Sequence, residues 1–314
     1  MKLQQLRYLT EVVRRGLNIS EAADALHTSQ PGVSKQIRAL EDELGVQVFV
    51  RHGKRLVSVT EPGKAVVAIA ERILSEAQNL RRAGEEFAND QLGTLTIAAT
   101  HTQARYALPK AVAAFKRRYP KVRLLIHQGN PTQICEQVLT GEADLCVATE
   151  GIAEYPDLVS MPVYQWNRCV VVPPKHALLK ALPLTLEKIA EYPIVTYDFA
   201  FANRSLVEKA FETRGLQPNV VLTALDSDVI KTYVELGLGI GILAKMAFDP
   251  KRDATLRAID ASHLFESSTT RLGVKRNAYL RRYAYEFIEL FAPHLPRAIV
   301  ERAVRGEEGS RYVL

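Results

Sequence analysis

Residues Ile19–Gly63 read ISEAADALHTSQPGVSKQIRALEDELGVQVFVRHGKRLVSVTEPG, and their pattern indicates how the N-terminal part of the chain folds. Ala22, Ala23 and Leu26 recur at helical spacing, and the small alanines let a second helix cross closely over the first. A second helix follows after a short break, with an apolar stripe that we expect to pack inward. That stripe consists of Val33, Ile37, Leu40 and Leu44. The pattern predicts a helix-turn-helix.

The two ends of the second helix have typical terminal residues. Ser29 is suited to an N-cap, and Pro31 fits the first turn, where its missing N–H costs nothing. Gly45 ends the helix as glycine often does. Polar side chains fall largely on a face away from the apolar stripe, and they are Gln30, Ser34, Lys35 and Arg38.

A short basic hairpin, Arg51–Arg55 (RHGKR), follows the second helix. The order of helix, turn, helix and hairpin is typical of a winged helix-turn-helix, in which the second helix enters the DNA major groove and cations contact the phosphates. The alternative is an ordinary amphipathic helix with a solvated polar face. The closely spaced first helix and the basic hairpin favour DNA binding. The predicted DNA-contacting residues are Ser29, Gln30, Pro31, Ser34, Lys35, Arg38, Arg51, Lys54 and Arg55.

Length and composition indicate a globular protein of two or three domains. The chain has 314 residues, of which 47% are hydrophobic and 24% charged. Its formal net charge of +6 permits nucleic-acid binding without demanding it. Affinity for DNA would therefore depend on where the cations lie, and on dimerisation that doubles the contacts.

No long apolar run resembles a membrane span, and the first residues, MKLQQLRYLTEVV, read as an amphipathic helix rather than a signal peptide. We therefore expect a cytoplasmic protein. The three cysteines, Cys135, Cys146 and Cys169, form no CxxC pair, and no His/Cys cluster has metal-ligand spacing. Buried structural thiols are favoured over a redox switch, and no metal or cofactor is predicted.

A long helix is predicted from Glu61 to about Asn89, after the hairpin. Its apolar positions step by four and three residues, as in a heptad seam: Val66, Ala70, Ile73, Ala77, Leu80, Gly84 and Phe87. The alternative is a helix that lies on its own domain. Charged residues flank the narrow stripe on both sides, so a partner helix from a second subunit is the better explanation.

From Gly93 onward, strand-like and helix-like segments alternate, and the pattern occurs in two similar blocks. Such alternation predicts mostly parallel sheets with helices on both faces, and two lobes with a ligand held between them. The fold class is thus α/β, with an N-terminal winged helix-turn-helix, a long linker helix and a two-lobed effector domain resembling periplasmic binding proteins. The predicted boundaries are 1–60 for the DNA-binding domain, 61–90 for the linker, 91–163 plus 268–300 for lobe I and 164–267 for lobe II.

Two segments in the lobes have the composition of a small-molecule site. Thr100–Gln103 lies between a strand end and a helix start, where hydroxyls and free N–H groups can hold an anion, and Thr149 ends another strand facing the same cleft. The second segment is Phe201–Arg204. Taken singly, each threonine is better explained as an N-cap or strand-end residue. Together they indicate a cup of neutral donors for a small polar anion.

The N-terminal motifs closely resemble the DNA-binding domain of LysR-type transcriptional regulators. The resemblance is carried by Ser29-Gln30-Pro31, Ser34, Ile37, Leu40-Glu41, Leu44-Gly45, Phe49, Arg51, Thr60 and Gly63. It extends over essentially the whole chain. THTQARYALP, NPTQICEQV, WNRCVVV and DVIKTYVELGLGIGILA further resemble the CysB-like subgroup, the activators of the cysteine regulon.

This resemblance implies a homotetramer that activates sulfur-assimilation and cysteine-biosynthesis genes and contacts RNA polymerase. It implies double-stranded promoter DNA as a partner, and as effectors acetylserine, sulfate, thiosulfate or adenosine phosphosulfate. The anion site of the subgroup matches Thr100, Thr102, Gln103 and Thr149 here, and Trp166 matches a position that tunes the inducer response, although ordinary packing between the lobes would also explain it. Ala202 departs from the subgroup, which typically has a threonine there, so sulfate binding is expected to be weaker or the ligand different.

Other classes of function also fit parts of the sequence. A LysR-type regulator of another pathway, such as sulfonate use or another small-anion response, would share the DNA-binding mechanism. A solute-binding protein would lack the N-terminal 90 residues and would carry a secretory signal. An enzyme would need a nucleophile, base or metal in reach, and no Ser/His/Asp, GxGxxG or P-loop pattern is present in the segments that form the cleft.

Overall fold

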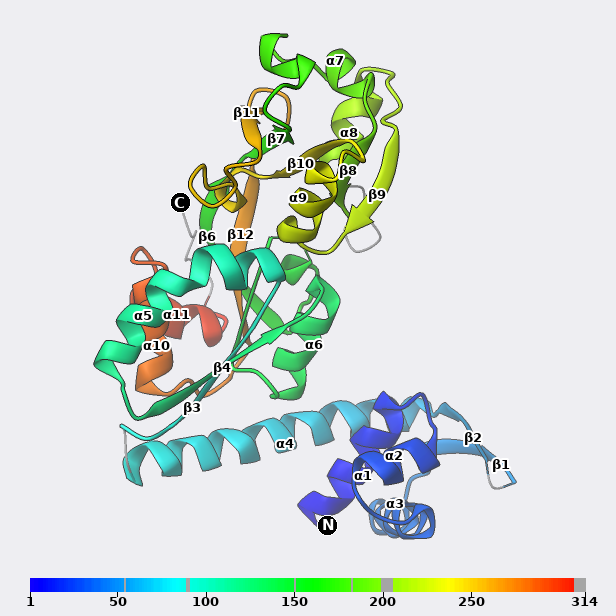
Figure 1. Ribbon diagram of the computed structural model, residues 1–314. Coiled ribbons are helices and arrows are strands. Elements are labelled where there is room, and N and C mark those ends of the chain that lie inside the picture. The colour runs from blue at the N-terminus through cyan, green and yellow to red at the C-terminus, as the bar shows by residue number, and fades with distance from the viewer. Residues whose placement is uncertain (54, 89–90, 150, 182, 199–205, 308–314) are drawn as a thin grey trace. The chain divides into compact units, whose positions relative to one another are not determined.

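The computed structural model describes residues 1–53, 55–88, 91–149, 151–181, 183–198 and 206–307 (Figure 1). It divides into two compact units, Met1–Phe87 and Ala88–Leu314. Lys54 and Ala202, together with the predicted segment Phe201–Arg204, lie outside the described residues.

The first unit is a helix-turn-helix followed by a hairpin and a long helix. Its elements are α1 (Leu3–Arg14), α2 (Ile19–Ala25), α3 (Gln30–Leu44), β1 (Phe49–His52), β2 (Arg55–Val59) and α4 (Glu61–Ala88). The strands β1 and β2 pair antiparallel and form the predicted hairpin. Ala22, Ala23, Val33, Ile37 and Leu40 are all buried in one core, as expected.

One predicted core position in α3 is wrong. Leu44 is 40% exposed, while Glu41 is buried at 2% exposure. The Glu41 carboxylate accepts hydrogen bonds from the backbone N–H groups of Val48 and Phe49 at 2.8 and 3.2 Å. It also pairs with Arg51 Nη2 at 2.7 Å. A buried carboxylate with this many donors fixes the end of α3 against the start of the hairpin.

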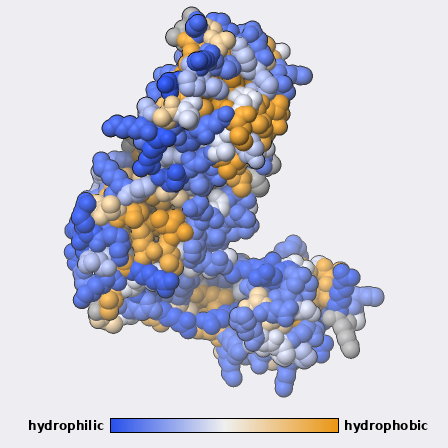
Figure 2. All heavy atoms as spheres, in the orientation of Figure 1, coloured by the Kyte–Doolittle hydropathy of each residue, from blue (hydrophilic) through white to orange (hydrophobic). Residues whose placement is uncertain are grey.

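The helix α4 begins inside the core of the first unit and leaves it halfway along. Val67 and Ala70 are buried in that core, whereas Leu80 and Phe87 are 76% and 89% exposed. Figure 2 shows some apolar side chains among mostly hydrophilic ones along α4. The first half of the helix therefore lies on its own domain, and the second half leaves apolar positions of the heptad seam exposed.

The start of α4 is held tightly against the hairpin. Thr60 Oγ1 donates to the carbonyl oxygen of Gln47 at 2.6 Å and accepts from the Gly63 N–H at 2.9 Å. A Cβ at Gly63 would lie 2.2 Å from the carbonyl oxygen of Val48, so only glycine fits there. The wing and the first turn of α4 thus form one packed block.

The second unit contains two five-stranded sheets, each in one lobe. The elements of lobe I are β3 (Gly93–Ala99), η1 (Gln103–Ala107), α5 (Leu108–Arg118), β4 (Val122–Gln128), α6 (Pro131–Thr140), β5 (Leu145–Ala148), η2 (Ile152–Glu154), β6 (Leu158–Trp166), β12 (Ser268–Lys275), α10 (Arg282–Phe291) and α11 (Arg297–Val304). The elements of lobe II are β7 (Arg168–Val172), η3 (Ala177–Lys180), α7 (Leu186–Ala190), β8 (Ile194–Tyr197), α8 (Leu206–Thr213), β9 (Val220–Ala224), α9 (Ser227–Glu235), β10 (Ile240–Ala244), η5 (Lys245–Ala247) and β11 (Arg257–Asp260).

Helices cover both faces of each sheet, as predicted. In lobe I, α5, α10 and α11 pack on one face and α6 on the other. In lobe II, α7 and α8 cover one face and α9 the other. The expectation of mostly parallel sheets is wrong, because each sheet is mixed. The strands run β4-β3-β5-β12-β6 in lobe I, where both pairings of β12 are antiparallel.

Two of the antiparallel strands, β6 and β11, were not predicted because their sequence patterns are weak. The sequence of β6, LVSMPVYQW, contains a proline and little alternation, and β11 is only four residues long. The strands β6 and β12 pair along their whole length, from Ser268 opposite Trp166 to Lys275 opposite Leu158. Both chain crossings between the lobes therefore occur next to Trp166 and Ser268.

All three cysteines are buried and free, as expected. Burial raises the pKa of the Cys169 thiol to about 12, which makes it unreactive at neutral pH. Among the residues that the structure describes, no helix combines the length and the apolar character needed to cross a membrane.

Candidate functional site

The exposed face of α3 is the candidate DNA-binding surface. The Ser29 hydroxyl accepts a hydrogen bond from the Gly32 N–H at 3.3 Å, which confirms the N-cap, and Gly45 ends the helix at φ +68°. The polar residues predicted to contact DNA are solvent-accessible: Ser29, Gln30, Pro31, Lys35 and Arg38 are exposed and Ser34 is partly so. Several hydrogen-bond donors on this face of α3 are therefore accessible to a DNA major groove.

The basic residues of the wing differ from one another. Arg55 is exposed at the start of β2. Arg51 is only 19% exposed and is paired with the buried Glu41, so its first role is to hold the hairpin on α3. The structure thus assigns Arg51 an intramolecular partner that the sequence pattern did not indicate.

The second candidate site is a cavity of about 710 Å³ between the lobes. Thr100, Thr102, Gln103, Thr149 and Trp166 all line it, so the structure brings together the described members of the predicted effector site. They come from the loop after β3, the helix start, the end of β5 and the end of β6. A cavity of this size suits a small organic ligand.

The chain is helical from His101 and forms a π-helical turn at Gln103–Ala107 before it continues as α5. The sequence predicted a regular helix here. Thr102, which precedes the π-helical turn, makes no side-chain capping hydrogen bond, and the first N–H groups of a helix have no partner within it. The Thr100 N–H is bonded to the carbonyl oxygen of Val147, which anchors the turn on the sheet. The remaining donors and the helix dipole favour an anion at this point.

The Gln103 side chain has a different role from the predicted one. It is 1% exposed, its Nε2 donates to Thr270 Oγ1 at 3.2 Å, and its Oε1 accepts from the Tyr164 hydroxyl. Both ends of the amide are therefore used inside the protein. Gln103 positions the helix start on β6 and β12, and can offer its backbone N–H to a ligand.

Trp166 connects two parts of the cavity wall. Its Nε1 donates to Thr149 Oγ1 at 3.3 Å, and the guanidinium carbon of Arg168 lies 5.0 Å from the centre of its ring. Arg168 is 5% exposed and lines the same cavity. The indole therefore both orients a threonine of the candidate anion site and stacks with a buried cation.

The two lobes also meet at the edge of the cavity, where the start of the lobe I helix faces the start of α9. Thr102 Oγ1 lies 3.4 Å from Ser227 Oγ, and the Tyr106 hydroxyl donates to Asp228 at 2.6 Å. Lys231 Nζ lies 3.0 Å from Asp228 Oδ1 and 2.9 Å from Asp253 Oδ1. These contacts form a polar latch between the lobes.

The latch shifts the titration of its members. Burial opposes ionisation of Asp228, but hydrogen bonds from Tyr106 and Lys231 outweigh it and lower the pKa of this carboxyl. Burial and the hydrogen bond to Asp228 raise the pKa of Tyr106. Burial would lower the pKa of Lys231, yet its hydrogen bonds with Asp253, Tyr106 and Asp228 raise it. The carboxylate and the ammonium are both charged at neutral pH.

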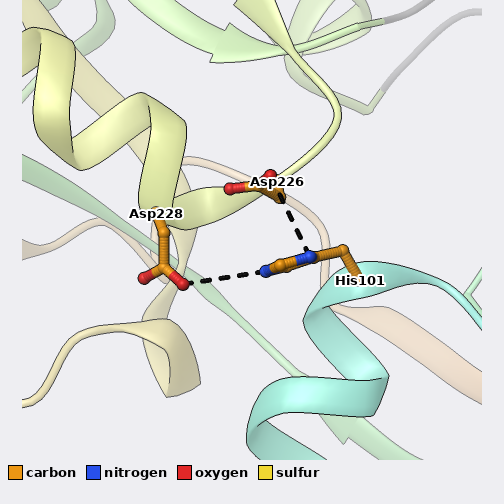
Figure 3. Close-up of side chains that lie close together, drawn as sticks. All are labelled: His101, Asp226 and Asp228. Carbon is orange, nitrogen blue, oxygen red and sulfur yellow. Dashed lines mark ion pairs between the residues drawn. The ribbon is translucent and has the colours of Figure 1, made fainter. Parts of the chain in front are cut away.

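His101 lies between two carboxylates of lobe II (Figure 3). Its Nδ1 is 3.9 Å from Asp226 Oδ2 and its Nε2 is 3.7 Å from Asp228 Oδ2, and the three side chains are close enough together to share an ion. Asp228 is already paired with Lys231 and with Arg105 Nε, and Asp226 caps α9. Cations that neutralise one carboxylate disfavour a metal ion, so this cluster fits the latch better than a metal centre.

Sequence reasoning missed the lobe II half of this site. The motif ALDSDVI contains a recognisable N-cap at Asp226, and its side chain accepts from the Val229 N–H at 2.8 Å. Nothing local, however, indicates that Ser227 and Asp228 face Thr102 and Tyr106, because these pairs are more than 100 residues apart along the chain. Only the tertiary fold brings them together.

Comparison with known proteins identifies the family of both parts of the chain. Residues 3–64 match a family described as "Bacterial regulatory helix-turn-helix protein, lysR family", and residues 88–296 match "LysR substrate binding domain". The chain is 55% identical over 310 residues to the HTH-type transcriptional regulator CysB of Burkholderia cenocepacia, covering 99% of each chain. It is also 55% identical to the regulator SsuR of the same organism, covering 97% of this chain and 99% of that one. The solved cofactor-binding domain of the Cbl transcriptional regulator superposes with a TM-score of 0.66 at 44% identity, covering 69% of this chain and 95% of that chain.

Proposed function

Since the chain belongs to the LysR family of bacterial transcriptional regulators, we propose that it binds promoter DNA through α3 and the wing and controls sulfur-assimilation and cysteine-biosynthesis genes in the cytoplasm. The observation that carries the DNA-binding surface is the exposed polar face of the capped helix α3. The close relationship to CysB and SsuR supports the choice of pathway. Another small-anion response, such as sulfonate use, is the alternative.

The proposed assignment separates base contacts from phosphate contacts. Gln30 and Arg38 lie on α3 and would reach base edges, whereas Arg55 lies on the wing and would contact phosphates. Lys54 and Arg51 were predicted for the same purpose. The structure does not describe Lys54, and the pairing of Arg51 with Glu41 leaves it a smaller part in DNA binding.

The test is selection from a random-sequence duplex library by the full-length protein, followed by affinity measurements on the selected motif at several salt concentrations. We expect Arg38→Ala to relax the base preference at one position and cost about 1–3 kcal/mol. We expect Arg55→Ala to keep the motif and to reduce the slope of log K against log salt by about one. If the wing variant changes the motif and the helix variant does not, the two assignments are reversed.

The effector proposed for the cavity is a small anion or anionic metabolite bound at Thr100, Thr102, the Gln103 backbone and Thr149. The candidates are sulfate, thiosulfate, acetylserine and adenosine phosphosulfate. Support comes from the uncapped helix start at the cavity wall. A thermal-shift screen with these compounds tests it, because a ligand that binds the folded state raises the melting temperature. A screen in which no compound does so contradicts the proposal.

The exposed half of α4 supports a homo-oligomer, with a tetramer as the proposed state. Leu80 and Phe87 continue the heptad seam beyond the part of α4 that its own unit covers. Two paired heads would read two half-sites on DNA. In this proposal the effector changes the arrangement of the two lobes. The changed lobes in turn alter how the oligomer lies on DNA and how the oligomer contacts RNA polymerase.

A further inference from the structure

The cavity between the lobes has a second polar end, away from the helix start at Thr100–Gln103. It is formed by Ser268 and Arg168, both of which line the cavity and are only 3% and 5% exposed. Ser268 Oγ has no hydrogen-bond partner among the described residues. A hydroxyl that is buried without a partner costs free energy, and a ligand group that enters this end of the cavity and forms a hydrogen bond with it would recover that cost.

The strand register places this second end at a defined distance from the first. Ser268 lies opposite Trp166 in the antiparallel pair of β12 and β6, so their side chains point to the same face. Thr270, two residues further along β12, also points to that face and accepts from Gln103 at the helix start. At about 3.4 Å per residue, Ser268 lies about 7 Å along the strand from the contact with Gln103.

The indole of Trp166 spans the interval between the two ends. Its Nε1 donates to Thr149 at the first end, and the Arg168 guanidinium stacks on its ring at the second. A donor hydroxyl and a buried guanidinium together favour a carboxylate or another oxyanion. An inorganic oxyanion at the helix start would be too small to reach them.

We propose that the cavity binds a ligand with two acceptor groups, an oxyanion at Thr100–Gln103 joined by a short carbon chain to a carboxylate at Ser268 and Arg168. The inference rests on the proposed effector site and narrows it. Inorganic sulfate would then fill only the first end, and Ser268 and Arg168 would determine which organic acid is recognised.

The test uses calorimetric titration of the full-length protein with sulfate, methanesulfonate, 2-hydroxyethanesulfonate and 3-sulfopropanoate at matched ionic strength. The expected order has 3-sulfopropanoate binding at least about tenfold more tightly than methanesulfonate, the effect of one added charge-assisted hydrogen bond, with the hydroxyl compound between them. Equal affinities for the three sulfonates would overturn the proposal. A protein that binds none of the four anions would instead contradict the anion site itself.

Two variants localise the effect. Ser268→Ala is expected to remove most of the gain in affinity for 3-sulfopropanoate. The affinities for sulfate and methanesulfonate should stay within about twofold of the unsubstituted protein, since the variant removes a hydroxyl only at the second end. Ser160→Ala is the matched control, because Ser160 on β6 also has a buried hydroxyl with no partner among the described residues but does not line the cavity. Loss of affinity for every anion in Ser268→Ala, with an unchanged melting temperature, would show that Ser268 belongs to the first end and would overturn the two-ended site.

Discussion

Two helices begin at the edge of the same cavity, one in each lobe. They differ in what lies at the positive end of the helix dipole. The helix of lobe II, α9, carries its own anion, because the Asp226 carboxylate accepts from the Val229 N–H. The helix of lobe I begins after Thr100, a neutral residue, and Thr102 in its first turn makes no side-chain capping hydrogen bond. Both starts carry the positive end of a helix dipole, but one N–H donor of α9 is already used by Asp226.

The difference indicates which lobe would receive the proposed ligand. A helix start that is already capped by a carboxylate repels a second anion, while an uncapped one attracts it. The two starts touch, since Thr102 Oγ1 lies 3.4 Å from Ser227 Oγ. A ligand bound by lobe I as proposed would therefore lie beside the part of lobe II that contacts Thr102, and it could change the arrangement of the lobes through this contact.

The largest effect is expected from giving lobe I the cap of lobe II. Thr100→Asp would place a carboxylate at the uncapped helix start, in the position that Asp226 occupies before α9. We expect sulfate affinity to fall at least about 100-fold, through repulsion and loss of free donors, without loss of stability. Isothermal titration calorimetry measures the affinity, and the neutral isostere Thr100→Asn is the control. Similar losses in both variants would show that shape, not charge, is responsible.

A smaller effect is expected from weakening the latch. Asp228→Asn keeps an acceptor for Tyr106 but removes the charge that pairs with Lys231 and Arg105, at a cost of about 1 kcal/mol at pH 7. Because the pKa of Asp228 is lowered in the folded state, its contribution is complete above the ordinary value near 3.9 and is lost as pH falls below it. Melting temperatures from pH 7 to pH 3 should therefore converge for the two proteins. A constant difference across this range would contradict the role given to this charge.

The smallest effect is expected from removing the anion of lobe II. Asp226→Asn preserves the N-cap, since asparagine caps as well as aspartate, but takes a negative charge from the cavity wall. Sulfate affinity should rise about twofold to fivefold, as for a solvent-screened repulsion. Titration at low and high salt checks the cause, because the gain should shrink as salt increases. A gain that is independent of salt would indicate a change in shape.

Much of the fold could be predicted from local patterns, and the failures have physical reasons. The capped helix α3 and the wing follow from residues close in sequence, such as Ser29 and Gly45. Periodicity placed Leu44 in the core, but the buried carboxylate of Glu41 is preferred there because it satisfies two backbone donors and Arg51. The strand β6 was missed because its partner, β12, is about 100 residues away.

Only part of the candidate site could be predicted from the sequence. Threonines at a strand end and a helix start, such as Thr100 and Thr149, indicate an anion site by their position alone. Gln103 was assigned to the ligand because its side chain is polar, although the fold uses that amide between Tyr164 and Thr270. Ser268 could not be found, because a serine at the start of a strand has no local signal of burial without a partner.

The block formed by the wing and the start of α4 has a consequence for DNA recognition. Gly63 is pressed against the carbonyl oxygen of Val48, and Val67 and Ala70 belong to the core on which α3 also packs. The helix α4 therefore cannot rotate without carrying α3 with it. In an oligomer joined through α4, the angle between two such helices would set the spacing of the two DNA half-sites that can be bound together. An effector that changes this angle would then select among promoters by the spacing of their half-sites rather than by their base sequence.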